Sequence, residues 1–143
     1  MKYTLICLLA LAGTACQRTA PVAHQMAPDK LMTAATGTFV NKGGQQTHGT
    51  YTCLRQGEDL YLELSADFGT DEGPDLHVML SPTALDSADN DNANVPGAFI
   101  VAPLQAQKGS QRYDLPDTLQ LQHYRTVMIH CVKYSHLYGA APL

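Results

Sequence analysis

The feature that most constrains the fold of this chain is the alternation of apolar and polar side chains with a period of two residues. In DLYLELSADF, Leu60, Leu62 and Leu64 fall on one face of an extended strand and the residues between them fall on the other. The segment DLHVMLSP, residues 75–82, alternates in the same way. This pattern predicts strands that bury one face in a core, and no segment of ten or more residues in the body of the chain carries a helical stripe.

The candidate strands recur about every ten residues and are separated by glycine-containing or polar turns. Gly43-Gly44, Gln56-Gly57 and Lys108-Gly109 mark three of these turns. A longer polar stretch, DSADNDNANVPG at residues 86–97, is predicted to be a solvated loop. The spacing predicts an all-β fold, an antiparallel β-sandwich or flattened barrel of about seven or eight short strands.

The C-terminal segment VMIHCVKYSHLYGAAPL, residues 127–143, predicts a final strand that differs from the others. Val127, Ile129 and Cys131 fall on one face, and the intervening residues, among them His130, fall on the other. Both faces are apolar. We therefore expect a central strand that is covered on both sides.

Composition and charge limit the classes of function. The 143 residues are 45% hydrophobic and 15% charged, which suits one domain with a packed core. A net charge of −4 leaves no basic surface for nucleic acid. The chain has no Ser-His-Asp set, phosphate loop or paired-carboxylate motif. The sequence therefore gives no support to a hydrolase and favours a protein that is not an enzyme.

The N-terminal residues 1–15 predict a signal peptide, with Lys2 followed by a short apolar segment. About ten apolar residues reach only about 15 Å as a helix, half of a bilayer core. The end of this segment, LAGTAC, resembles a bacterial lipobox with Cys16 as the acylated residue, although Gly13 stands where the pattern prefers Leu. An ordinary signal peptidase would also cut before Cys16, so both kinds of processing remain open.

The expected organisation is a signal peptide, a lipid-anchored tether over residues 16–36 and a folded domain over residues 37–143. We expect export to the bacterial cell envelope, where the lipid would hold the protein at a membrane facing the periplasm or the exterior. Only Cys53 and Cys131 remain in the folded domain. Both would then lie in an oxidising compartment, where disulfides persist.

Five segments in order resemble the DM-thirteen domain family, a small exported module that in animals occurs beside DOMON domains. They are GTF (37–39), HGTYT (48–52), EGPDLHVMLSP (72–82), KGSQRYDLP (108–116) and VMIHCVKYSHLYGAAPL (127–143). The resemblance implies a β-sandwich-like domain with a proposed electron-transfer role. It implies that the last-strand cysteine, here Cys131, does redox work as a bare thiol or as a ligand to a prosthetic group. The chain departs from the pattern at His130, where relatives commonly carry Trp, and at the additional Cys53.

Two interpretations of Cys131 compete. A redox thiol needs thiolate character, and a free cysteine has a pKa of about 8.5. The apolar neighbours of Cys131 favour burial instead. A disulfide between Cys53 and Cys131 would close a long loop and add about 4 kcal/mol of stability in the chain-entropy model. In that alternative the domain is a non-catalytic envelope interaction or structural module.

Metal or haem ligation is a third interpretation, and the cofactor stays open between haem and copper. The chain has no C-x-x-C-H motif for covalent haem. The weak ligand candidates are His48, His77, His130 and His136, and no dedicated metal site is predicted. Because His130 and Cys131 are adjacent on a strand, their side chains point to opposite faces and cannot easily share one metal. The redox or envelope protein partner is not identified by the sequence.

The loop GTDEGPD carries a turn signal at Gly73 and Pro74. Asp75 is predicted to cap this turn by accepting hydrogen bonds from backbone amides. We interpret all three residues as structural.

Overall fold

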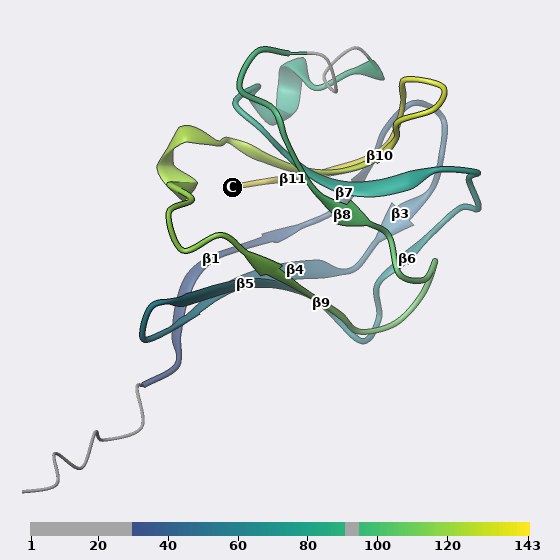
Figure 1. The fold of residues 1–143 in the computed structure, drawn as a ribbon. Helices are drawn as coiled ribbons and strands as arrows, with labels where there is room; N and C mark the ends of the chain where they lie inside the picture. Colours follow the sequence, from purple (N-terminus) through teal and green to yellow (C-terminus); the bar gives the residue numbers. More distant parts are fainter. Residues whose placement is uncertain (1–29, 91–94) are drawn as a thin grey trace, which may run out of the picture.

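The computed structural model describes residues 30–90 and 95–143, and it is an antiparallel β-sandwich whose two sheets do not close into a barrel. Figure 1 shows the two sheets as separate layers. The all-β prediction is confirmed, and the sandwich is the correct one of the two predicted architectures. The predicted signal peptide and the predicted lipidation site, Cys16, lie outside the described residues.

The first layer is a four-stranded sheet with the order β1-β4-β5-β9, in which all neighbouring strands are antiparallel. Its strands are β1 (Met32–Thr38), β4 (Thr50–Gln56), β5 (Asp59–Leu64) and β9 (Gln111–Leu115).

The second layer is a five-stranded sheet with the order β2-β11-β10-β7-β8. Its strands are β2 (Val40–Asn41), β11 (His136–Pro142), β10 (Thr126–Cys131), β7 (Leu76–Ser81) and β8 (Phe99–Pro103). The short strands β3 (Thr47–His48) and β6 (Gly69–Thr70) pair with each other, and 3-10 turns lie at Leu85–Ser87 and Leu121–His123. Of the eleven described strands, eight have five residues or more, in line with the predicted number.

The main core fills the space between the two sheets, as the alternation predicted. Leu60, Leu62 and Leu64 of β5 are at most 2% exposed and belong to this core. On the outward face of the same sheet, the Arg112 guanidinium lies 3.3 Å from the centroid of the Tyr61 ring. The four-stranded sheet therefore has one apolar face and one face that meets water.

The five-stranded sheet is buried on both faces at its centre. Every residue of β10 is buried. A second apolar cluster lies on the outer face of this sheet and consists of Met79, Ala88, Met128, Leu137 and Ala140. Ala88 comes from the loop predicted to be solvated, so the described part of that loop covers the sheet. The prediction of a central strand covered on both sides is confirmed.

The C-terminal segment forms a hairpin, which corrects the prediction of one final strand. β10 ends at Cys131, a turn follows, and β11 returns antiparallel beside it. Ser135 in this turn has φ 49°, a left-handed conformation that reverses the chain. Cys131 therefore lies at the end of the penultimate strand, and the exposed Tyr134 marks the turn that the sequence analysis missed.

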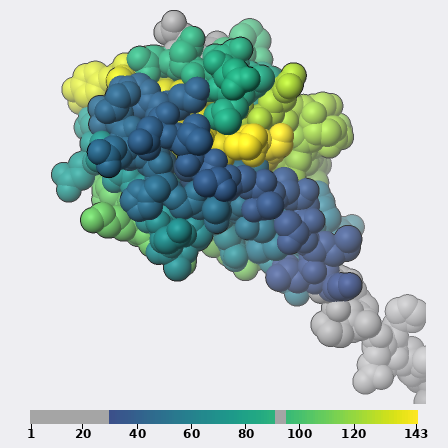
Figure 2. All heavy atoms as spheres, turned by 180° about the vertical axis from the view of Figure 1, so that it is seen from behind, coloured from purple at the N-terminus to yellow at the C-terminus, as the bar shows by residue number. Residues whose placement is uncertain are grey.

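The first strand begins at Met32, within residues 16–36, for which the sequence predicts a tether. Most of its side chains are exposed, so their pattern gave no strand signal. Backbone pairing with β4 holds it, and the Thr36 hydroxyl donates to the Tyr51 carbonyl at 2.8 Å. Figure 2 shows this strand in purple on the surface, beside the yellow C-terminal residues. Within residues 30–90 and 95–143, no helix has the length and apolar character needed to cross a bilayer.

Candidate functional site

The Cys131 side chain lies in the main core at one end of β10. Its residue pairs with Leu76 of β7 on one side and with His136 of β11 on the other. Cys131 is 1% exposed, and the core around it includes Tyr138. The ring of Tyr138 packs edge-on against His136, with the ring centroids 5.5 Å apart. Cys131 is thus a buried thiol that shares the end of the sandwich with one imidazole and one phenol.

The phenol of Tyr138 is held by the turn that the sequence analysis identified. Its hydroxyl donates to the Glu72 carbonyl at 3.3 Å. A Cβ on Gly73 would lie 2.7 Å from a Leu76 methyl and 2.8 Å from the Tyr138 hydroxyl, so a side chain there would displace both groups. Burial raises the pKa of Tyr138, and the neighbouring Cys131 thiol raises it further. The phenol therefore stays protonated beside the cysteine.

Asp75 contacts a histidine. Its carboxylate, predicted to accept hydrogen bonds from backbone amides, lies 3.5 Å from Nδ1 of His77. Its backbone carbonyl accepts the amide of Val132 at 3.0 Å. Asp75 therefore connects the start of β7 to the turn after Cys131.

Cys53 and Cys131 are both free thiols, so the structure does not contain the predicted disulfide between them. They stand in different sheets and at different heights in the sandwich. The Tyr51 hydroxyl, two residues from Cys53, donates to the carbonyl of Pro142. Pro142 pairs with Thr126, which begins β10. Cys131 ends the same strand and lies about 17 Å from Thr126, at about 3.3 Å per residue. A disulfide needs Cα atoms about 5.5 Å apart, so the two cysteines are too distant to bond.

Cys53 is an unreactive thiol. It is fully buried within the four-stranded sheet. Burial raises its pKa to about 12, because the apolar surroundings disfavour the thiolate. Since the thiolate is the nucleophilic form, Cys53 contributes packing only.

His130 lies on the outer face of the five-stranded sheet, away from Cys131. The two residues belong to opposite faces of β10, as predicted from their adjacency. The carbonyl oxygen of Asn90 lies 3.0 Å from Nε2 of His130, and since a carbonyl only accepts, Nε2 carries the proton. Nδ1 is then unprotonated, and it is buried without a hydrogen-bond partner in the part of the chain that the structure describes. Burial lowers the pKa of His130, the backbone groups of Asn90 and Cys131 partly oppose this shift, and the nearby His136 and His77 add to it.

The other predicted ligand histidines divide into three positions. His77 pairs directly with His130 on the outer face. His136 pairs with Cys131, and its Nε2 is buried with no hydrogen-bond partner within residues 30–90 and 95–143. His48 stands apart in β3, packed over Gly69. Among the residues that the structure describes, no group of three or more His, Cys, Asp or Glu side chains is placed to hold a metal ion.

Asn90 and Tyr138 are site residues that the sequence analysis missed. Besides the bond to His130, the Asn90 carbonyl accepts from the Ser135 hydroxyl at 3.0 Å, and Oδ1 of Asn90 accepts from the Leu137 amide at 2.9 Å. Nothing in the polar loop distinguishes Asn90 from its neighbours. Tyr138 had a signal, since it stands two residues after His136 and therefore shares its face.

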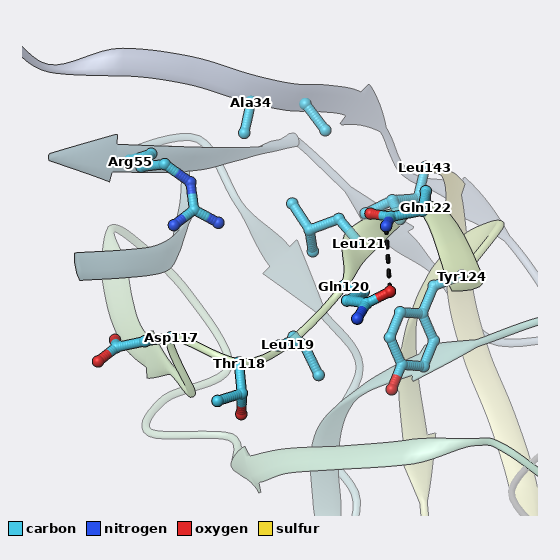
Figure 3. Close-up of a pocket in the computed structure, with 11 residues that line it drawn as sticks. Ala34, Arg55, Asp117, Thr118, Leu119, Gln120, Leu121, Gln122, Tyr124 and Leu143 are labelled. Atoms are coloured by element: carbon cyan, nitrogen blue, oxygen red, sulfur yellow. Dashed lines mark hydrogen bonds between the residues drawn. The ribbon is translucent and has the colours of Figure 1, made fainter. Parts of the chain in front are cut away.

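A separate pocket of about 820 Å³ opens beside β1, the segment after β9 and Leu143 (Figure 3). Arg55 reaches toward it from β4, while Leu119, Leu121 and Tyr124 form its apolar side. None of the described residues that line it is a cysteine or a histidine. Cys131, His77, His130 and His136 therefore lie on or at the end of the five-stranded sheet and outside this pocket.

Comparison with known proteins gives one match. A family model described as Electron transfer DM13 matches residues 38–143, which is most of the chain. No curated protein and no solved structure matches.

Proposed function

The chain belongs to the electron transfer DM13 family, as the five motif segments indicated, and on this premise we propose that Cys131 is the redox-active residue of an electron-transfer module. The observation that carries this proposal is the free thiol of Cys131, which is packed in the core beside Tyr138 and paired across the hairpin with His136. The second thiol, Cys53, is held protonated by burial.

The position of Cys131 supports electron transfer better than nucleophilic chemistry. At 1% exposure the sulfur is closed to substrates of any size, whereas an electron can cross a thin layer of protein. Cys131 also ends its strand beside the exposed Tyr134 turn, which brings the sulfur near one end of the domain. A partner protein would dock at this end.

The proposed step is a one-electron oxidation of the Cys131 thiol. The sulfur gives one electron to an oxidised one-electron carrier protein, and the S–H bond breaks as its proton leaves. The proton passes to His136, whose residue is the direct cross-strand neighbour of Cys131 and whose buried Nε2 has no hydrogen-bond partner among the described residues. Directly paired residues in a sheet have Cβ atoms about 5 Å apart, so the proton reaches the imidazole through a bridging water or after a turn of the His136 side chain. The reverse step returns one electron and one proton to the sulfur.

The location of this module is part of the proposal. Residues 1–15 carry the signal-peptide pattern, and Cys16 ends a lipobox-like sequence. We expect a lipid on Cys16 to hold the domain at a membrane of the bacterial envelope, facing the periplasm or the exterior. Metabolic labelling with a palmitate analogue tests this part, and a Cys16→Ala chain supplies the unlabelled control.

Protein-film voltammetry on the metal-free full-length protein tests the role of Cys131. The wild-type chain should give one redox wave, Cys131→Ser should lose it, and Cys53→Ser should keep it. The Cys53 variant is the matched control, since it removes the other buried thiol. His136→Gln should keep the wave but weaken its dependence on pH, because the proton acceptor is gone.

Two outcomes would overturn the proposal. A wave that persists in Cys131→Ser would place the redox group elsewhere. A wild-type protein without any wave would leave a non-catalytic envelope module whose cysteines only pack. Circular dichroism of each variant establishes that a lost wave does not reflect lost folding.

A further inference from the structure

Two neighbouring cross-strand pairs stand together on the outer face of the five-stranded sheet. Met79 of β7 pairs with Met128 of β10, and two residues along the same strands His77 pairs with His130. Residues two apart on a strand share a face, so all four side chains project from the same side. Met79, Met128 and His130 are fully buried, and the His77 side chain is 16% exposed.

The two imidazoles are oriented in the same manner. Nε2 of His130 donates to the Asn90 carbonyl at 3.0 Å, and Nδ1 of His77 lies 3.1 Å from the Asp75 carbonyl, which can only accept. Each ring therefore directs one nitrogen at a backbone carbonyl and turns its other nitrogen to the opposite side, where a neutral ring presents a lone pair. In proteins, metal-binding histidines almost always donate their second N–H in this way.

The unprotonated Nδ1 of His130 is the independent sign of a ligand. It is buried and has no hydrogen-bond partner within the described residues. A buried acceptor without a partner costs about 1–3 kcal/mol relative to one that is satisfied. A bound metal ion would supply the missing partner and would leave the bond to Asn90 intact.

From these observations we propose that Met79, Met128, His77 and His130 form a binding site for a monovalent copper ion. Thioethers are soft ligands that select Cu⁺, and imidazole also suits copper. Directly paired residues stand about 5 Å apart and residues two apart on a strand about 7 Å apart, so the ends of the four side chains can converge on one ion. Two of the four ligands are thioethers, so the site contains only two His residues. It therefore agrees with the observation that no three His, Cys, Asp or Glu side chains of the described residues are placed to hold a metal ion.

The surroundings suit a copper ion that must be held away from water. Ala88 belongs to the same apolar cluster as the two methionines, and the partly buried Leu85 and Ala98 pack against that cluster. The Asp75 carboxylate lies 3.5 Å from Nδ1 of His77 and supplies one negative charge beside the site. An ion would enter the site from the solvent beside His77, the one partly exposed ligand of the four. This site goes beyond the proposed function and uses neither Cys131 nor His136.

Anaerobic titration of the full-length protein with Cu⁺, in competition with the coloured chelator bicinchoninate, tests the proposal. Thiols that react with iodoacetamide in the native protein are blocked first, so that they do not bind the ion. The wild-type chain should bind one Cu⁺ per molecule. The double variant Met79→Leu/Met128→Leu keeps side-chain volume and should lose at least about 30-fold in affinity while keeping its melting temperature within a few degrees. Met32→Leu, which changes an exposed methionine of β1, is the matched control and should bind as the wild type does.

Two further measurements separate this site from the cysteine. Cys131→Ser should bind Cu⁺ with unchanged affinity, and X-ray absorption of the copper-loaded protein should show both nitrogen and sulfur ligands. His77→Gln should weaken binding at least about tenfold, because it removes one imidazole from the rim of the site. The proposal is overturned if the wild-type protein binds no stoichiometric Cu⁺, if the leucine double variant binds as tightly as the wild type, or if Cys131→Ser abolishes binding. None of these outcomes bears on the voltammetry of the metal-free protein, so the two proposals can fail separately.

Discussion

The two sheets of this sandwich differ in how many faces they bury. In the four-stranded sheet, β9 alternates strictly between buried and exposed residues, and its outward face carries Arg112 and Asp114. In the five-stranded sheet, every residue of β10 is buried, because a second apolar cluster covers the outer face. The four-stranded sheet therefore has one solvent-exposed face, whereas the centre of the five-stranded sheet is buried on both faces.

This difference indicates on which sheet of a small β-domain reactive or ligand-binding side chains can lie. Polar groups on a wet face are solvated by water, and water weakens their interactions. Polar groups inside a double-covered sheet need protein partners, and their pKa values respond to burial. His130, His77 and the Cys131 thiol all belong to the double-covered sheet. The four-stranded sheet holds Cys53, which shares its face with the phenol of Tyr51.

The largest expected effect compares the outward faces directly. Met128→Ala removes a fully buried side chain from the outer face of β10 and should lower the free energy of unfolding by about 2–5 kcal/mol. Glu63→Ala, on the outward face of β5, should cost less than about 1 kcal/mol, since it removes only an exposed ion pair with Arg112. Urea denaturation measures both. Equal losses would show that the two sheets are covered alike.

The next effect is a dependence of stability on pH that arises from His130. Its pKa is lowered in the folded protein, so the unfolded chain binds a proton at higher pH than the folded chain does. Stability from the neutral imidazole is complete above the unfolded pKa of about 6.5 and is lost as the pH falls below it, with a slope of up to about 1.4 kcal/mol per pH unit. Chemical denaturation between about pH 7.5 and about pH 5, the range in which histidine changes its charge, should show this slope. His130→Gln keeps a donor toward Asn90 and should lose most of the slope, whereas an unchanged slope would assign it to another group.

The two thiols provide a smaller difference in reactivity. Cys53 is fully buried in the middle of β4, and its pKa is raised to about 12, so it should react with iodoacetamide only when the whole domain unfolds. Cys131 is also buried but ends β10 beside a turn, where a local opening suffices. Pulsed alkylation followed by peptide mass analysis should show that Cys131 is labelled at least about tenfold faster, which corresponds to about 1.4 kcal/mol in opening free energy. Equal rates would mean that both sheets open together.

The smallest effect concerns the wet face of the four-stranded sheet. The Arg112 guanidinium stacks on Tyr61 at 3.3 Å and lies within 3.8 Å of Glu63. Arg112→Lys keeps the charge but loses the planar stacking, and it should cost about 0.5–1 kcal/mol. Thermal unfolding at low and high salt separates the two contributions, because salt screens the ion pair and leaves the stacking. A loss of several kcal/mol in the free energy of unfolding would show that this face is as buried as the outer face of the five-stranded sheet.

Much of the fold followed from local pattern. The period of two in β5 identified Leu60, Leu62 and Leu64 as core residues, and the opposite orientation of His130 and Cys131 followed from their adjacency. The turn after Cys131 escaped prediction because Lys133, Tyr134 and Ser135 interrupt an apolar run only briefly. The reversal there depends on the positive φ of Ser135, which composition does not signal.

The sequence by itself determined the class of fold, the inward and outward faces of the long strands, the family and the identity of the candidate thiol, because side-chain periodicity and motif order are local properties of the chain. Only the tertiary structure decided which residues became neighbours. It placed Cys53 and Cys131 in different sheets as separate thiols, and it folded the loop with Asn90 over His130. It also aligned two methionines beside two histidines through the register of β7 and β10. Register and loop placement are set by packing between segments that are distant in sequence, and no single segment encodes them.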